Sequence, residues 1–316
     1  NVGVDFALFR HRLSGTIEYY NKYSVDLLAA INGSPTQGFG YTTLMTNNGK
    51  MVNRGVEITL SGEIIRQKDF SWNASLLYAF NRNKVKHISV QPSLWDSRIS
   101  MPTSYPMVGK PLYGIYAYKW AGLNENGDPQ VYDAENNVTS GPARDYHALV
   151  YCGTTVPIHN ASLTNVLRYK GFEFSAMLIL DAGHKLRSSN IPSINMSNGR
   201  ITSTAKGIVD RWTQPGDVTD VPRLLFSNDT ENFNTHRTEL YRYSDLFVYD
   251  ASNIRLSNIS LAYRVPAHWC KKISLSGARL QFNVENVATF AFDSKANYDL
   301  GGKVKPNYVW GLYLNF

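Results

Sequence analysis

The sequence predicts an all-β fold, an antiparallel transmembrane β-barrel wall with long extracellular loops. Three observations support this prediction. Apolar and polar residues alternate with a period of two along much of the chain, as in strands that have two different faces. The connections between these strands are alternately short and long. Aromatic residues make up 13% of the 316 residues and charged residues only 18%, against roughly 25% in an average soluble domain.

The alternation predicts four hairpins and one closing strand along the chain. The hairpins pair residues 2–9 with 13–23, 56–64 with 70–80, 162–169 with 172–180, and 254–265 with 273–287, and residues 308–316 form the last strand. About ten strands are counted in all. In the clearest hairpin, Val56, Ile58, Leu60 and then Ile64 fall on one face. The phase slips near Ser257 and Gly277, where β-bulges are predicted.

The connections between the strands alternate in length. Residues 11–12, 66–69, 170–171 and 266–272 are short joints, whereas residues 24–50, 83–111, 181–250 and 288–307 are long and rich in Gly, Ser, Asn, Pro and Tyr. Outer-membrane barrels have short periplasmic turns and long extracellular loops, so this alternation favours a barrel over a soluble sandwich. Residues 203–212, in the longest loop, are the one helical candidate.

The last strand carries an unbroken apolar stripe. Its members are Tyr308, Trp310, Leu312, Leu314 and Phe316. We interpret the stripe as a lipid-facing surface with aromatic residues near both interfaces, and as a signal for barrel assembly. The alternative is a buried terminal strand of another β fold.

Composition and motifs exclude several other classes of protein. No apolar run approaches the roughly 18 residues of a membrane-spanning helix. The net charge is +7, but the basic residues are scattered, so no nucleic-acid partner is expected. Cys152 and Cys270 have no nearby second cysteine, which excludes a cysteine-built zinc site, while one long-range disulfide stays open.

Catalytic and metal-binding patterns are weak. The seven histidines are isolated, and no HExxH, GxSxG or phosphate-binding loop occurs, so neither an enzyme nor a cofactor is predicted. Asn124, Asn126 and Asp128 have the alternate oxygen donors of a calcium loop but lack its usual last ligand. The alternative for these three residues is an Asn-Gly turn.

Aromatic residues in the long loops are the candidates for contact with a substrate or a partner. They are Trp95, Tyr105, Trp212, Tyr241 and Tyr298. Aromatic faces beside amide and carboxylate groups bind oligosaccharides through stacking and hydrogen bonds. The alternative is that these rings form interfacial girdles or pack the loops together.

Five segments together resemble one family. They are residues 19–28 (YYNKYSVDLL), 49–57 (GKMVNRGVE), 113–129 (with WAGL and GDP), 211–222 (RWTQPGDVTDVP) and 250–261 (DASNIRLSNISL). Their motifs resemble those of the SusC-type TonB-dependent outer-membrane transporters of Bacteroidetes, the SusC/RagA-like family. The resemblance extends in order along the whole chain.

The resemblance implies a nutrient importer in the outer membrane of a Gram-negative bacterium. Such an importer takes up glycans, or in some members peptides, with a SusD-like surface lipoprotein as a lid and energy from TonB–ExbB–ExbD. It also implies that residues 1–316 are the C-terminal part of a barrel of roughly 22 strands. The plug, the TonB box and the first strands would then lie in another part of the protein.

Three other functions stay open at this point. A passive porin-like barrel requires these strands to close on themselves. A soluble, secreted glycan-binding protein requires that there be no lipid-facing band. An outer-membrane hydrolase requires a serine and a histidine close together on the barrel wall.

Overall fold

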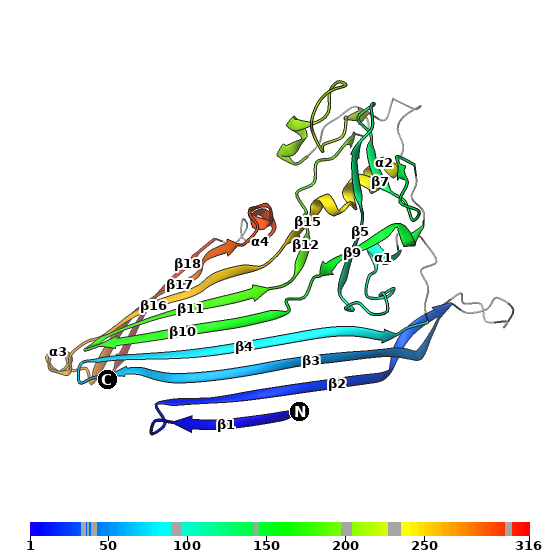
Figure 1. Ribbon diagram of the computed structural model, residues 1–316. Coiled ribbons are helices and arrows are strands. Elements are labelled where there is room, and N and C mark those ends of the chain that lie inside the picture. Colours follow the sequence, from blue (N-terminus) through cyan, green and yellow to red (C-terminus); the bar gives the residue numbers. More distant parts are fainter. Residues whose placement is uncertain are drawn as a thin grey trace.

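A nine-stranded antiparallel sheet is the largest part of the computed structural model, which describes residues 1–32, 36, 38, 43–89, 97–141, 145–196, 204–226, 235–300 and 305–316. Its strand order is β1-β2-β3-β4-β10-β11-β16-β17-β18 (Figure 1). The strands are β1 (Val2–Leu8), β2 (Leu13–Asn32), β3 (Thr43–Arg66), β4 (Phe70–His87), β10 (His159–Tyr169), β11 (Phe172–Ala182), β16 (Asn253–Arg264), β17 (Gly277–Ala291) and β18 (Asn307–Asn315). The predicted all-β antiparallel fold is confirmed, with nine strands in this sheet.

The sheet has one apolar and one polar face. Residues that pair across neighbouring strands lie on the same face, so the register defines rows across the sheet. One apolar row contains Val4, Ile17, Ile58, Tyr78, Ala161, Leu180, Ile254 and Phe290. One polar row contains Ser14, Ser61, Ser75, Thr164, Met177, Asn258, Glu285 and Asn307. These two rows show the alternation predicted for a barrel wall, with Met177 as an apolar exception in the polar row.

Several strands are longer than predicted. Residues 24–32 and 43–50 were expected in a loop, but they belong to β2 and β3, and β4 continues to His87. These segments lack a regular apolar stripe, and so the sequence pattern does not reveal them as strands. Backbone pairing does not require that stripe: Ser24 pairs with Met51, and Leu28 pairs with Asn47.

The bulges are only partly where the sequence places them. The register shifts between Leu256 and Asn258, as predicted near Ser257. The bulge predicted near Gly277 is wrong. Strand β17 instead shifts register between Glu285 and Ala288, where Asn286 has a φ of 54°. Another shift lies between Glu63 and Ile65. It removes Ile64 from the apolar stripe, and Ile65 pairs with Trp72 instead.

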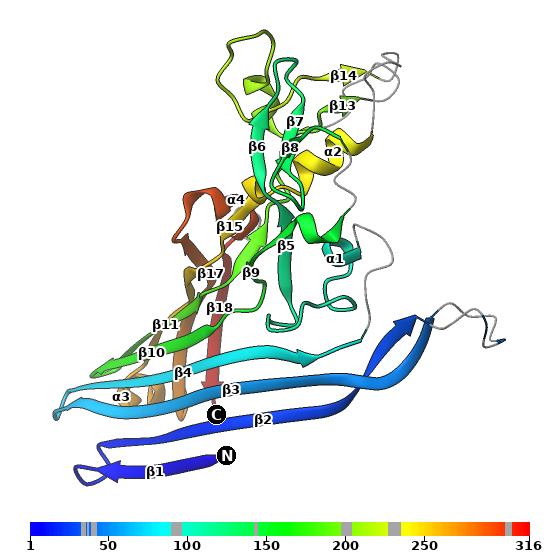
Figure 2. The same ribbon diagram turned by 45° about the vertical axis from the view of Figure 1, so that its right-hand side comes forward.

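The two ends of the sheet differ as predicted. The β1–β2, β3–β4 and β10–β11 turns lie at one end, together with α3 (Ala267–Lys271) between β16 and β17 (Figure 1). Two of the long connections, β4–β10 and β11–β16, rise from the opposite end and fold into a unit of small sheets and helices (Figure 2). We call the described residues within 97–157 and 185–250 the loop subdomain.

The loop subdomain has four small sheets. They pair β5 (Gly114–Tyr118) with β9 (Leu149–Thr154), β6 (Trp120–Leu123) with β7 (Pro129–Tyr132) and β8 (Val138–Thr139), β12 (Lys185–Arg187) with β15 (Val248–Asp250), and β13 (Asn195–Met196) with β14 (Leu225–Phe226). Its helices are α1 (Ser97–Ser100) and α2 (Thr235–Arg242), and α4 (Asn297–Leu300) lies between β17 and β18. Short 3-10 turns are η2 (Tyr146–Ala148), η4 (Lys206–Asp210) and η5 (Asp245–Phe247), with η6 (Ser294–Ala296) before α4.

Helices are short throughout the described residues. The helical candidate at residues 203–212 is a 3-10 turn over Lys206–Asp210, while Ser203 lies outside the described residues. Helix α2 was not predicted, because its sequence THRTELYR lacks an apolar period. Among the described residues, no helix is long and apolar enough to span a membrane.

Spin labels at Leu60 and Thr59 are expected to report different surroundings in the whole protein in a bilayer. Leu60 belongs to an apolar row with Gly15 and Leu76, whereas Thr59 pairs with Thr16 on the polar face. Oxygen should relax the Leu60 label and a soluble paramagnetic reagent the Thr59 label. Equal accessibility of the two labels to both reagents would contradict the assignment of the faces.

Candidate functional site

An ion-pair network forms the centre of the loop subdomain. The Asp128 carboxylate accepts from Arg223 Nη2 at 2.8 Å and from Arg237 Nε at 3.1 Å. Arg237 is only 2% exposed, and it also donates to the carbonyl oxygens of Ile194, at 3.1 Å, and Arg223, at 2.7 Å. These acceptors offset the cost of burying the guanidinium group. The network therefore connects the β6–β7 turn to α2 and to the strand β14 region.

A second arginine ties the helix to the central sheets. Arg187 donates to the Tyr116 carbonyl at 2.7 Å and to the Arg242 and Ser244 carbonyls at 3.2 Å each. Burial lowers the pKa of its guanidinium group. Through Tyr116, Arg187 contacts a buried apolar cluster of the described residues. That cluster consists of Tyr116, Tyr118, Val131, Ala148, Leu149 and Leu240.

Trp212 faces inward in this structure. Its ring lies directly against Gly127, whose φ of +73° and missing Cβ allow this approach. Its backbone N–H donates to Val221 at 2.8 Å, and Trp120 Nε1 donates to Asp220 at 2.9 Å. Residues 212–222 therefore fold back onto the β6–β7 turn. Two of the segments that carry the family resemblance thus form one scaffold.

The remaining aromatic candidates do not gather at one site. Tyr241 is buried, with ring centroids 4.9 Å from Phe247 and 5.9 Å from Trp120, and burial raises its pKa. Tyr105 is half-buried beside α1, where its carbonyl accepts from Arg98 at 3.4 Å. Tyr298 is about half exposed on α4. Trp95 lies outside the described residues.

The calcium candidate forms a turn in which its oxygen atoms already have partners. Asn124 Oδ1 accepts from the backbone N–H groups of Asn126 and Asp128 at 3.0 and 2.9 Å. Both carboxylate oxygens of Asp128 bind arginines. Among the described residues, no group of three or more His, Cys, Asp and Glu side chains could hold a metal ion. The arrangement thus favours the Asn-Gly turn.

The stripe on the last strand is exposed in this chain. Tyr308, Trp310, Leu312 and Leu314 are 41–79% exposed along β18, and Phe316 is 92% exposed beyond it. Among the described residues, strand β18 is an edge of the sheet and pairs only with β17. Trp310 packs on Phe282 across that pairing, with ring centroids 4.2 Å apart. The stripe thus continues the apolar face as far as this edge.

The cysteines are not joined. Cys152 and Cys270 are free thiols in this structure. Burial, assisted by the nearby Asp245 carboxylate, raises the pKa of Cys152 to about 11. The long-range disulfide that the sequence left open is therefore not formed here.

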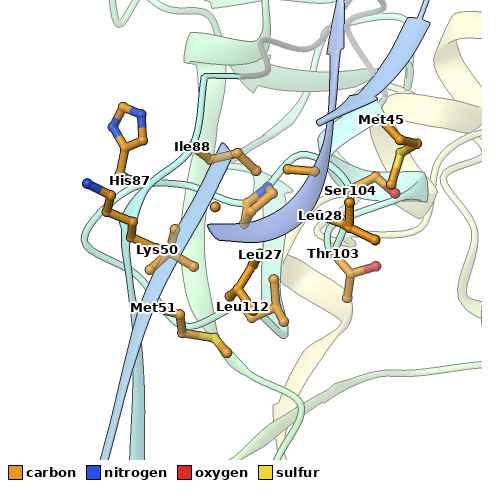
Figure 3. Close-up of a pocket in the computed structure, with 14 residues that line it drawn as sticks. Leu27, Leu28, Met45, Lys50, Met51, His87, Ile88, Thr103, Ser104 and Leu112 are labelled. Carbon is orange, nitrogen blue, oxygen red and sulfur yellow. The ribbon is translucent and has the colours of Figure 1, made fainter. Parts of the chain in front are cut away.

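An apolar cavity at the far ends of β2–β4 was missed by the sequence analysis. It has a volume of about 260 Å³, and its lining includes Leu27, Leu28, Met45, Met51, Val85 and Leu112. Figure 3 shows Leu27 and Leu112 beside Met51, with Lys50 and His87 at one side. The sequence signal that could have revealed this cavity is the set of apolar residues, such as Leu27, Leu28 and Met45, within residues 24–50, which the sequence analysis interprets as a loop.

Comparison with known families defines the class of protein. The family model described as "TonB dependent receptor-like, beta-barrel" matches residues 1–287. The chain therefore belongs to the β-barrel family of TonB-dependent receptors, which are outer-membrane proteins of Gram-negative bacteria. The apolar face of the sheet is accordingly the lipid face, and the polar face is the lumenal face.

Individual relatives are similar along nearly the whole chain. TonB-dependent receptor P3 of Formosa agariphila is 25% identical over 334 residues, which cover 99% of this chain and 32% of the relative. SusC of Bacteroides thetaiotaomicron is 24% identical over 300 residues, 90% of this chain and 28% of SusC. The chain thus spans about a third of the length of the curated relatives it matches.

A solved structure confirms the fold. The structure of the RagAB peptide transporter superposes on 99% of this chain and 34% of its own, with a TM-score of 0.75 and 21% sequence identity. The predicted family, barrel fold and outer-membrane location are therefore confirmed.

Proposed function

We propose that this chain supplies barrel wall and extracellular loops to a TonB-dependent importer of peptides or glycans. The observation that carries the proposal is the sheet with one lipid face and one polar face, whose loops gather at the end opposite to the tight turns. In this proposal the plug, the TonB box and the first strands belong to the rest of the same protein. TonB–ExbB–ExbD acts through that part.

Completion of the barrel by further strands is supported by the edges of the sheet. In the described residues, β1 and β18 each pair with a single neighbour, and they do not pair with each other. Lipid cannot satisfy the free N–H and C=O groups of such edges. This arrangement disfavours a passive barrel closed by these nine strands alone.

A hydrolase is also disfavoured. The Ser89 hydroxyl lies 3.3 Å from His87 Nε2, but it donates to Asn48 Oδ1 at 3.0 Å. Because a hydroxyl has only one proton to donate, Ser89 does not also donate to His87 in this arrangement. In the described part of the chain, no ion pair with a carboxylate orients His87. The pair therefore lacks the relay of a nucleophilic serine.

The geometry favours peptides over glycans as the transported class. Glycan sites use exposed aromatic faces with polar edges, but Trp212 and Tyr241 pack inside the loop subdomain. The apolar cavity instead offers leucine and methionine side chains, among them Leu28 and Met45. Such a lining suits the aliphatic side chains of a peptide.

We place the contact with a SusD-like lipoprotein at the tip of residues 212–222. Trp212 and Asp220 anchor this segment to the β6–β7 turn, which leaves Val218 fully exposed. An apolar residue held at the tip of a braced loop is a suitable anchor for a partner.

Val218→Arg in the full transporter is expected to reduce recovery of the lipoprotein from detergent-solubilised outer membranes, and to slow the uptake of labelled oligopeptides. Labelled oligosaccharides should enter poorly with or without the substitution. The matched control is Ile273→Arg, which also places a charge at an exposed apolar position but at the end with the tight turns. Unchanged recovery and uptake for Val218→Arg would defeat the proposed contact. Faster uptake of oligosaccharides than of peptides would overturn the substrate class.

A further inference from the structure

The lipid face of β3 and β4 becomes basic where its apolar band ends. On β4 the apolar residues at alternate positions end at Phe80, and the next positions on that face are Arg82, Lys84 and Lys86. On β3 the band ends at Val56, the next position is Arg54, which pairs with Arg82, and the position after that is the buried Val52, which pairs with Lys84. The change from apolar to cationic therefore occurs at the same level on both strands.

These cations surround one cavity. It has a volume of about 680 Å³ and is lined by Arg54, Arg82, Lys84, Lys86 and Lys110 together with apolar residues of the band, including Tyr19, Val56 and Phe80. No residue in this lining is acidic. Lys110 Nζ lies 4.8 Å from the centre of the Tyr151 ring, and Arg54 Nε donates to Asn21 at 3.1 Å. None of the five cations forms an ion pair with a carboxylate of the described residues.

The cavity lies at the level of the outer-leaflet headgroups. Tight turns mark the periplasmic end of such barrels, and these cations are at the opposite ends of β3 and β4. The apolar band of β4 runs from Phe70 to Phe80. At about 3.4 Å per residue and a tilt of about 40°, it spans about 26 Å, which matches the usual hydrocarbon band of about 25 Å.

We propose that this cavity binds the phosphate groups of a phosphorylated glycolipid of the outer leaflet. Arg and Lys side chains that form no ion pair with a carboxylate can supply charge-assisted hydrogen bonds to phosphate oxygens. The apolar residues at the membrane side, Val56 and Phe80, provide a surface for the acyl chains of the same molecule. A soluble anion would use the cations but not this wall, which is why the geometry favours a lipid. The site lies on β3 and β4, away from both free edges of the sheet.

The test uses the full transporter, delipidated in detergent, with three probes: a purified phosphorylated lipid A, the same glycolipid after removal of its phosphates, and inorganic phosphate. Binding is measured by native mass spectrometry. The variant Arg82→Gln/Lys84→Gln removes two of the cations. The matched control Lys271→Gln/Lys272→Gln removes the same charge from α3 and the residue after it, at the periplasmic end. Heat-modifiable migration in gels checks that each variant is folded.

The wild-type and control proteins are expected to bind the phosphorylated glycolipid and to bind its dephosphorylated form far more weakly. At about fivefold per cation near a membrane surface, the double variant should bind on the order of 30-fold more weakly. Inorganic phosphate should compete poorly.

Equal binding by the variant and the wild type would overturn the proposal, as would no preference for the phosphorylated form. Full displacement by inorganic phosphate would assign the cavity to a soluble anion. If the double variant no longer captures the lipoprotein but still binds the glycolipid like the wild type, the cavity would be assigned to the partner protein. Either result overturns the lipid site.

Discussion

The variant Asp128→Ala is expected to destabilise the loop subdomain by about 3 kcal/mol or more, because it leaves a buried guanidinium without its counter-charge. Arg237 is nearly inaccessible, and its Nε forms an ion pair with the Asp128 carboxylate at 3.1 Å. The same substitution also removes the partner of Arg223. Hydrogen exchange should therefore rise in β7 and α2, while the nine-stranded sheet keeps its protection.

A control for this experiment is Glu135→Ala, an exposed carboxylate on the neighbouring β7–β8 turn. It should leave exchange in β7 and α2 unchanged. The second variant, Arg237→Met with Asp128→Ala, removes both partners and should recover part of the lost protection, since the fully buried guanidinium is removed together with its carboxylate. Wild-type exchange rates in the Asp128→Ala protein would show that the network contributes little to the subdomain.

The variant Phe316→Asp is expected to lower the amount of folded transporter in the outer membrane severalfold. Phe316 is almost fully exposed, and the stripe from Tyr308 onward faces lipid on an edge strand. Loss of packing within this chain is therefore a small part of the effect. The larger part is the loss of an apolar surface that we interpret as the signal for barrel assembly. Heat-modifiable migration of membrane fractions in gels measures the folded amount.

Asn315→Asp is the matched control, because it introduces the same charge one position away, on the opposite face of β18. It should assemble like the wild type. If Phe316→Asp yields as much folded protein as this control, the last stripe is not an assembly signal, and its role is restricted to contact with lipid.

The sheet could be predicted from sequence because each face has its own chemistry. Ile58 and Leu60 alternate with Glu57 and Thr59, and this local pattern specifies both a strand and its orientation. The bulge at Ile64 could not be predicted in the same way, since a register shift depends on the pairing strand. The strands also continue past the band, where lipid no longer requires alternation.

The packing of the candidate site was beyond such reasoning. Trp212 was assigned to a contact surface, yet its ring packs on Gly127, which is distant in the sequence. A glycine that accommodates a ring looks the same in sequence as a glycine in any turn. Likewise, α2 has no amphipathic pattern, because one of its buried residues, Arg237, is held by ion pairing and hydrogen bonds.

Strands β2 and β3 remain hydrogen-bonded out to Asn32 and Thr43, well beyond the apolar band that ends near Val56. The ladder shifts register between Ser24 and Leu28 and then continues to the end of both strands. On this side the rim of the sheet therefore consists of two paired strands that extend beyond the apolar band. In the proposed importer, a lipoprotein lid above this side would close against paired strands.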